Sequence, residues 1–98
     1  MAFYVVQYAY TTDSSRIDEL RPSHREYLRS LAERGILRAS GPFVEAPSPS
    51  ALFVYYADHE DDVRACVEDD PFQKADLVQA WSVTQWNPVI GVFASEAG

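Results

Sequence analysis

The stretch FYVVQYAY, residues 3–10, decides the fold. Apolar side chains stand at odd and even positions alike, and aromatic and β-branched residues dominate. This pattern is typical of a central strand that is covered on both faces. The TTDSS segment at residues 11–15 follows with turn and helix-capping side chains. We therefore expect a sheet with residues 3–10 in its interior and a helix directly after them.

The next segment, residues 16–34, predicts that helix. Its apolar positions, three and four residues apart, are Ile17, Leu20, Tyr27, Leu28 and Leu31, with His24 on the same face. Pro22 lacks an amide donor and its ring clashes with the preceding turn. We therefore expect either a short turn at residues 14–20 with the main helix starting near Pro22, or one helix kinked there. Gly35 predicts the helix end.

The rest of the chain predicts three more strands and two more helices. The expected elements are strands at residues 36–43, 51–57 and 79–86, a helix from Asp58 as N-cap to about Glu68, and a short helix through Lys74. Asp70 and Pro71 are typical of the N-cap and first position of that short helix. Gly41 and Pro42 predict a bulge or bend in the second strand.

This order of elements, βαββαβ, predicts an α+β, ferredoxin-like fold: a four-stranded antiparallel sheet with the helices on one face. We expect a single domain over residues 1–98, with its core at about 3–87 and a C-terminal tail at 88–98. Large apolar side chains on both faces of the predicted strands also indicate a homodimer that packs sheet to sheet.

Composition excludes several classes of function. The formal net charge of −7 argues against nucleic acid and against an anionic membrane surface as partners. The single cysteine, Cys66, allows no intrachain disulfide and no cysteine-based zinc site, and is expected to be a buried, inert thiol. With two histidines lacking ligand-like spacing, we expect no metal site and no cofactor. Residues 1–10 lack the features of a signal peptide, so we expect a cytoplasmic protein.

His24 is the first candidate functional residue. An imidazole can act as acid or base near neutral pH, provided that a partner, typically a carboxylate, orients its ring. The simpler alternative is a structural histidine whose ring nitrogens are satisfied. Asp70 taken alone is most simply a helix cap, although a carboxylate has enough lone pairs to cap a helix and orient a histidine together.

The segments RPSHREYLRSL (21–31), SGPF (40–43), DDPFQKADL (69–77) and WNP (86–88) together resemble the YciI-like family, the YCII-related domain, over about residues 3–90. The resemblance implies a ferredoxin-like fold of the dimeric α/β-barrel group. It also implies a small-molecule pocket centred on His24 and Asp70. The residues expected around that pocket are Tyr8, Ser40, Gly41, Pro42 and Phe72. Residues 75–77 read Ala-Asp-Leu where relatives often have Ala-Gly-Leu, so the turn there is an open question.

Two functions follow as hypotheses. The first is a cofactor-independent enzyme of the lyase, isomerase or hydrolase type, in which His24 is the general acid/base and Asp70 holds its imidazole. Ser40 and Tyr8 would donate hydrogen bonds to a developing oxyanion. The resemblance implies a small organic substrate, since some relatives are associated with the breakdown of chlorinated aromatic compounds. The alternative is a non-catalytic module that binds a small ligand or a protein and uses the pair structurally.

Overall fold

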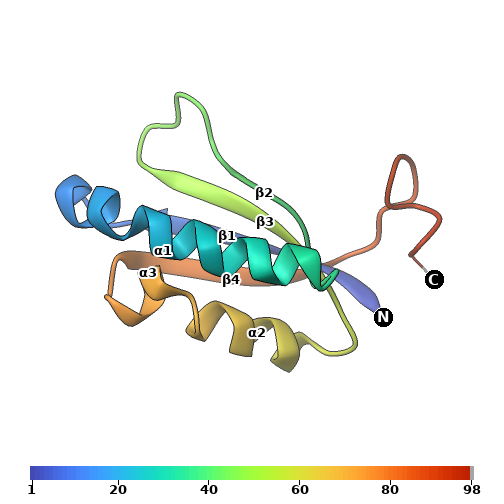
Figure 1. Cartoon of the computed structure of the whole chain (residues 1–98). Helices are drawn as coiled ribbons and strands as arrows, with labels where there is room; N and C mark the ends of the chain where they lie inside the picture. The colour runs from blue at the N-terminus through green and yellow to red at the C-terminus, as the bar shows by residue number, and fades with distance from the viewer. Residues whose placement is uncertain (98) are drawn as a thin grey trace.

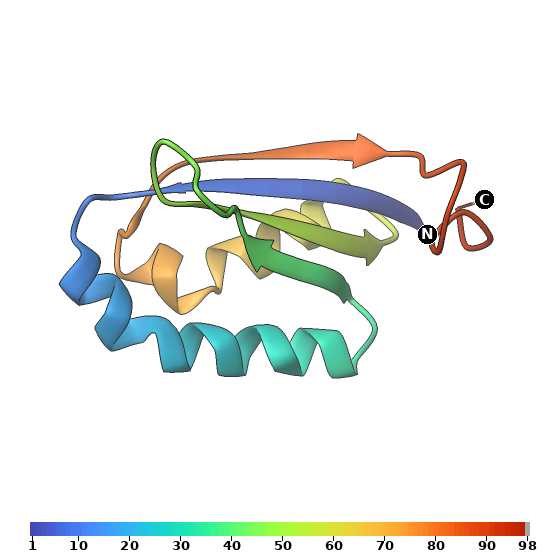
Figure 2. The same cartoon turned by 90° about the horizontal axis from the view of Figure 1, so that it is seen from above.

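The computed structural model describes residues 1–97, in which four strands form one antiparallel sheet in the order β2-β3-β1-β4 (Figure 1). The strands are β1 (Ala2–Tyr10), β2 (Leu37–Pro42), β3 (Ser50–Ala57) and β4 (Val78–Trp86), and the helices are α1 (Ser14–Glu33), α2 (Glu60–Glu68) and α3 (Pro71–Lys74). The helices cover one face of the sheet (Figure 2). The predicted α+β, ferredoxin-like fold is therefore confirmed.

Strand β1 is paired on both edges, as the FYVVQYAY pattern predicts. Val6 at its centre stands opposite Phe53 of β3 and Val83 of β4. Alternate residues of β1 point toward the helices, where Tyr4, Val6 and Tyr8 belong to the hydrophobic core. These side chains fill the space between the sheet and the helices, and so fix the distance at which α1 can lie.

Helix α1 runs without interruption from Ser14 to Glu33 with Pro22 inside it, so the single-helix alternative is the correct one. Figure 2 shows the first turns inclined to the remainder of the helix, as expected where a proline removes one backbone hydrogen bond. Asp13 caps the start by accepting from the Arg16 amide. Gly35, with a φ of 76°, ends the helix as predicted.

Two local details depart from the sequence pattern. His59 occupies the N-cap of α2, so the prediction of Asp58 is wrong by one residue; the Asp58 carboxylate instead lies 3.5 Å from the amino terminus. Asp76 answers the question raised by the Ala-Asp-Leu turn. It adopts a φ of 59°, the left-handed conformation that glycine favours and that aspartate tolerates better than most residues. The turn after α3 is thus preserved.

Helices α1 and α2 are joined by a hydrogen bond of 2.6 Å from the Tyr27 hydroxyl to the Cys66 carbonyl. Cys66 is half-buried, and burial raises the pKa of its thiol, which disfavours the reactive thiolate. Within residues 1–97, no helix is long and apolar enough to cross a membrane.

Candidate active site

Asp70 lies at the turn between α2 and α3, where it is 1% exposed. As the N-cap of α3, its Oδ1 accepts a hydrogen bond of 2.9 Å from the Phe72 amide. The same oxygen lies 2.8 Å from Nδ1 of His24, a residue of α1 that is 7% exposed. Asp70 therefore caps a helix and holds a histidine at once. The two residues that the sequence proposed as a pair are in contact.

Tyr8 supplies a third hydrogen bond to this carboxylate. Its hydroxyl, on the helix-facing side of β1, donates to Asp70 Oδ2 at 2.8 Å. Burial and the adjacent Asp70 charge both raise the pKa of the Tyr8 phenol, so that it remains a protonated donor. Sequence reasoning placed Tyr8 as a donor to substrate, whereas this geometry makes it a support for Asp70.

The His24 imidazole is fixed by aromatic contacts as well as by Asp70. It stacks on the Phe72 ring with 4.0 Å between centroids and 12° between planes, and meets Phe53 edge-on at 6.3 Å. A carboxylate only accepts hydrogen bonds, so Nδ1 must carry the hydrogen that faces Asp70. In the neutral ring, Nε2 then holds the free lone pair. Nε2 has no hydrogen-bond partner among residues 1–97.

A cavity of about 530 Å³ opens beside His24, between α1 and the β2–β3 end of the sheet. Its lining residues are Tyr10, Ile17, Arg21, His24, Arg25, Leu28, Ser40, Gly41, Pro42, Phe43, Pro49, Ser50, Ala51, Phe53 and Phe72. The structure thus brings His24, Phe72 and the Ser40-Gly41-Pro42 segment to one cavity. Among residues 1–97, Asp70 and Tyr8 do not line the cavity. They lie on the Nδ1 side of the imidazole, where Asp70 contacts His24 and Tyr8 contacts Asp70.

Arg21, Arg25 and Tyr10 are cavity residues that sequence reasoning missed. Arg21 and Arg25 flank His24 on α1, and Tyr10 meets Phe72 edge-on at the end of β1. The helical periodicity held a usable signal, because positions 21 and 25 project to one border of the apolar face that contains His24. Within the described part of the chain, acidic, histidine and cysteine side chains form no group of three suited to a metal ion.

The site can therefore move a proton. His24 lines the cavity, one of its ring nitrogens is held by a buried carboxylate, and the other has no hydrogen-bond partner among residues 1–97. General acid–base chemistry requires an imidazole held in this way. Ser40, which the sequence analysis placed in the pocket, also lines the cavity, and its hydroxyl can donate a hydrogen bond there.

Comparison with known proteins agrees with this fold. The family model described as YCII-related domain matches residues 1–87. Among solved structures, 5-chloro-2-hydroxyhydroquinone dehydrochlorinase from Burkholderia phenoliruptrix, in complex with 2,5-dihydroxybenzoquinone, is 24% identical with a TM-score of 0.75, covering 86% of this chain and 92% of that one. A search of curated proteins gave no match.

Two more distant structures share the fold. A protein from Agrobacterium tumefaciens is 15% identical, with a TM-score of 0.57 and coverage of 90% and 93%. An antibiotic biosynthesis monooxygenase is 14% identical, with a TM-score of 0.58 and coverage of 92% and 100%. At these identities the likeness concerns the arrangement of the elements.

Proposed function

Since this chain belongs to the YCII-related domain family, we propose that it is a small enzyme that acts without a cofactor on a small organic substrate, with His24 as general acid/base. The observation that carries the proposal is the 2.8 Å contact between Nδ1 of His24, which lines the cavity, and Oδ1 of Asp70, which is not among the lining residues described for residues 1–97. A buried carboxylate in this position sets the tautomer and stabilises the imidazolium that forms on proton transfer.

The reaction begins with removal of a substrate proton by Nε2. The electron pair of the broken O–H or C–H bond then forms a double bond that expels a leaving group, to which His24 passes the proton, or it shifts so that the His24 imidazolium returns the proton to another atom of the substrate. The first outcome is a lyase reaction and the second an isomerisation. Ser40 donates a hydrogen bond to the oxygen on which charge develops. Acid–base assistance of this kind accelerates reactions by about 10²–10⁴-fold.

Two observations support a ring compound as substrate. The cavity walls include the aromatic rings of Phe53 and Phe72, and the volume of about 530 Å³ suits a small molecule. The Burkholderia dehydrochlorinase, which shares this fold, is bound to 2,5-dihydroxybenzoquinone. A small, hydroxylated or halogenated aromatic compound is therefore the substrate class that we would test first.

The protein is proposed to work as a homodimer that packs through the sheet face opposite the helices. On that face Val5 of β1 stands between Val54 of β3 and Thr84 of β4, and Leu52 lies two residues from Val54 along β3. Figure 2 shows both long helices on the other face. An open face on which Val5 and Leu52 remain half-buried gains stability by packing on a second copy.

The test is a turnover screen over haloaromatic diols and small lactones, with the variant His24→Asn beside the wild-type protein. Asparagine can keep an amide hydrogen near the position of Nδ1, so contact with Asp70 is retained while the base is lost. We expect normal folding and at least a 100-fold loss of turnover, roughly the scale of acid–base assistance. The matched control is His59→Asn, at an exposed histidine on the N-cap of α2.

The same two variants distinguish this proposal from the alternative, which is a ligand-binding module in which the His24–Asp70 pair is structural. The proposal fails, and the pair is structural, if the melting temperature of His24→Asn is well below that of the wild-type protein and neither of these two proteins turns over any compound in the screen. Full turnover by a folded His24→Asn variant would also contradict it.

A further inference from the structure

We propose that Arg21 and Arg25 form an anion-binding subsite, so that the cavity takes a planar organic acid whose carboxylate or phenolate lies on these guanidinium groups and whose reactive atom faces His24. This inference rests on the proposed function and names its substrate class. It concerns binding, and binding can be measured whether or not turnover is found.

The two arginines are placed by the helix that carries the base. Arg21 and Arg25 are four residues apart, so their side chains leave α1 on the same side, one turn from each other. Both line the cavity together with His24. Asp18, one turn earlier, accepts a hydrogen bond of 2.6 Å from Nη1 of Arg21, which leaves the other guanidinium N–H groups of that side chain for a ligand.

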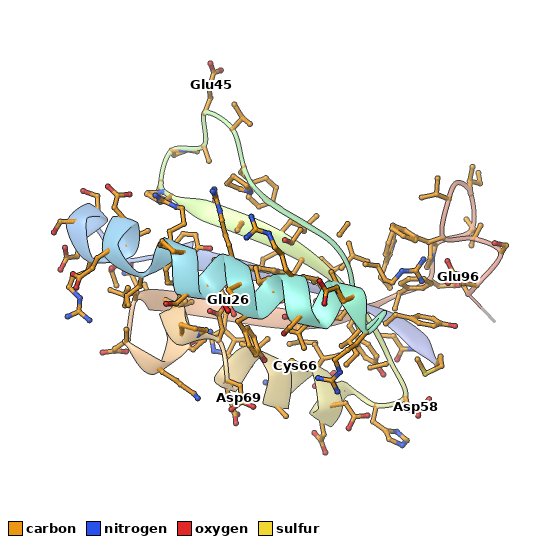
Figure 3. The ribbon with its side chains drawn as sticks, viewed as in Figure 1. Glu26, Glu45, Asp58, Cys66, Asp69 and Glu96 are labelled. Atoms are coloured by element: carbon orange, nitrogen blue, oxygen red, sulfur yellow. The ribbon has the colours of Figure 1, made fainter. Side chains whose placement is uncertain are left out.

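The lining of the cavity differs from the acidic chain around it, because its charged side chains are cationic. The formal net charge is −7, yet the cavity lining contains two arginines and, among residues 1–97, no aspartate or glutamate. The β2–β3 loop adds Phe43 and Pro49 to the lining, while its acidic residue, Glu45, points away from the sheet at the loop tip (Figure 3). Cationic groups beside low-dielectric walls favour an anionic ligand over a neutral one.

The rest of the lining suits a flat hydrocarbon or ring. Ile17, Leu28 and Phe53 present apolar surface, and Phe72 stacks on the His24 ring with 4.0 Å between centroids. Two guanidinium groups on one side and an apolar floor match a single carboxylate or phenolate on a ring.

This arrangement also serves the proposed chemistry. When Nε2 removes a proton from a ligand that is already anionic, a second negative charge develops on the ligand. Guanidinium groups held at the cavity wall stabilise that charge without reorganisation. Arg21 and Arg25 are thus specificity-determining residues that also favour the transition state.

The test is a titration of the full chain with benzoate, with 4-nitrophenolate and with benzamide, the neutral isostere of benzoate, followed by amide chemical shifts. We expect at least one of the two anions to bind and benzamide to bind at least tenfold more weakly. Arg21→Gln and Arg25→Gln should each weaken anion binding about tenfold, the loss of one charge-assisted hydrogen bond. The anion that binds more tightly identifies the carboxylate or the phenolate.

The matched control is Arg29→Gln, which removes the same charge one turn further along α1. Arg29 lines a neighbouring groove, and its variant should bind the anion as the wild-type protein does. Equal affinity for benzoate and benzamide, or equal losses in all three arginine variants, would overturn the proposal. Retained anion binding by His24→Asn separates the two ideas, because the subsite then stands even if the turnover screen fails.

Discussion

The hydroxyl of Tyr8 donates to Asp70 across 62 residues of sequence, and so joins the central strand to the cap of α3. Asp70 thereby has both oxygens occupied: Oδ2 by Tyr8, and Oδ1 by the Phe72 amide and His24 Nδ1. A buried carboxylate with three donors is fixed in orientation, and it fixes the ring that it contacts. The position of His24, the proposed general base, is therefore determined by the core of the fold.

Removing the Tyr8 hydroxyl should loosen this network. The Tyr8→Phe variant loses a buried hydrogen bond to a charged group, which is typically worth about 1.5–3 kcal/mol of unfolding free energy. We expect a loss in that range by urea denaturation. Turnover should fall less than in His24→Asn, because the base is retained. A variant as stable as the wild-type protein would show that water replaces the hydroxyl.

Stability should also fall in alkaline solution. Burial raises the pKa of Tyr8, Tyr10 and Tyr55 above the ordinary value of 10.0. Above about pH 10 the unfolded chain releases phenolic protons that the folded chain keeps, so the stability contributed by these groups is complete below pH 10 and is lost as pH rises above it. Each such tyrosine adds a slope of about −1.4 kcal/mol per pH unit.

Urea denaturation between about pH 8 and pH 11.5 measures that slope. The unfolding free energy of the wild-type protein should not change through these phenols up to about pH 9, and it should fall above pH 10. The unfolding free energy of Tyr8→Phe should fall less steeply with pH, because this variant lacks one of the phenolic protons. The same slope in both proteins would mean that Tyr8 does not keep its proton in the folded state.

Asp70→Asn tests the orienting carboxylate directly. Asparagine is a good N-cap, so α3 should still form. Its amide cannot accept as many hydrogen bonds as the carboxylate and cannot stabilise an imidazolium by charge. We expect stability to fall by about 1–3 kcal/mol and turnover by about 10²–10⁴-fold. Near wild-type turnover in this variant would assign Asp70 to helix capping alone. Asp69→Asn, at the exposed preceding residue, is the control.

Local sequence patterns singled out His24 and Asp70 separately, and the resemblance to the YCII-related domain family supplied the prediction that they form a pair. His24 falls on the apolar face by helical spacing, and Asp70-Pro71 is a cap whose chemistry is visible in two residues. The contact of Tyr8 with Asp70 could not be predicted, because it depends on how β1 and α3 meet across the core, and Tyr8 was expected to donate to the substrate instead. Arg21 and Arg25 resemble ordinary solvent-facing residues until the β2–β3 loop and the end of the sheet form the opposite wall.

The open sheet face predicts the oligomeric state. Val5 lies at the centre of that face, between Val54 and Thr84. If two copies pack through it, Val5→Glu buries an unpaired charge, whose cost is several kcal/mol per ion, and should yield a monomer. Sedimentation velocity at micromolar concentration should show a dimer for the wild-type protein. Ala32→Glu, on the exposed side of α1, is the control and should remain dimeric.

The C-terminal tail should be held by charge. Arg38 bonds both carboxylate oxygens of Glu96, at 2.5 and 2.7 Å, and its guanidinium lies 5.4 Å from the Phe93 ring. Glu96 lies in the tail beyond the end of the sheet (Figure 3). The hydrogen bonds and charge of Arg38 lower the pKa of Glu96 below its ordinary 4.5. The contact is thus complete above pH 4.5 and is lost as pH falls through the lowered value.

Trp86 reports whether the tail is docked, since its ring meets Phe93 edge-on at 6.3 Å. At neutral pH, we expect the chemical shift of the Trp86 indole N–H in Glu96→Gln to move toward its value in Phe93→Ala, a variant that lacks the ring contacting Trp86. High salt should move the wild-type signal the same way, because the Arg38–Glu96 ion pair is partly exposed to solvent and is therefore screened. Ser95→Ala, beside Glu96, is the control. An indole signal indifferent to Glu96→Gln and to salt would mean that Phe93 docks through its aromatic contacts alone, without help from the ion pair.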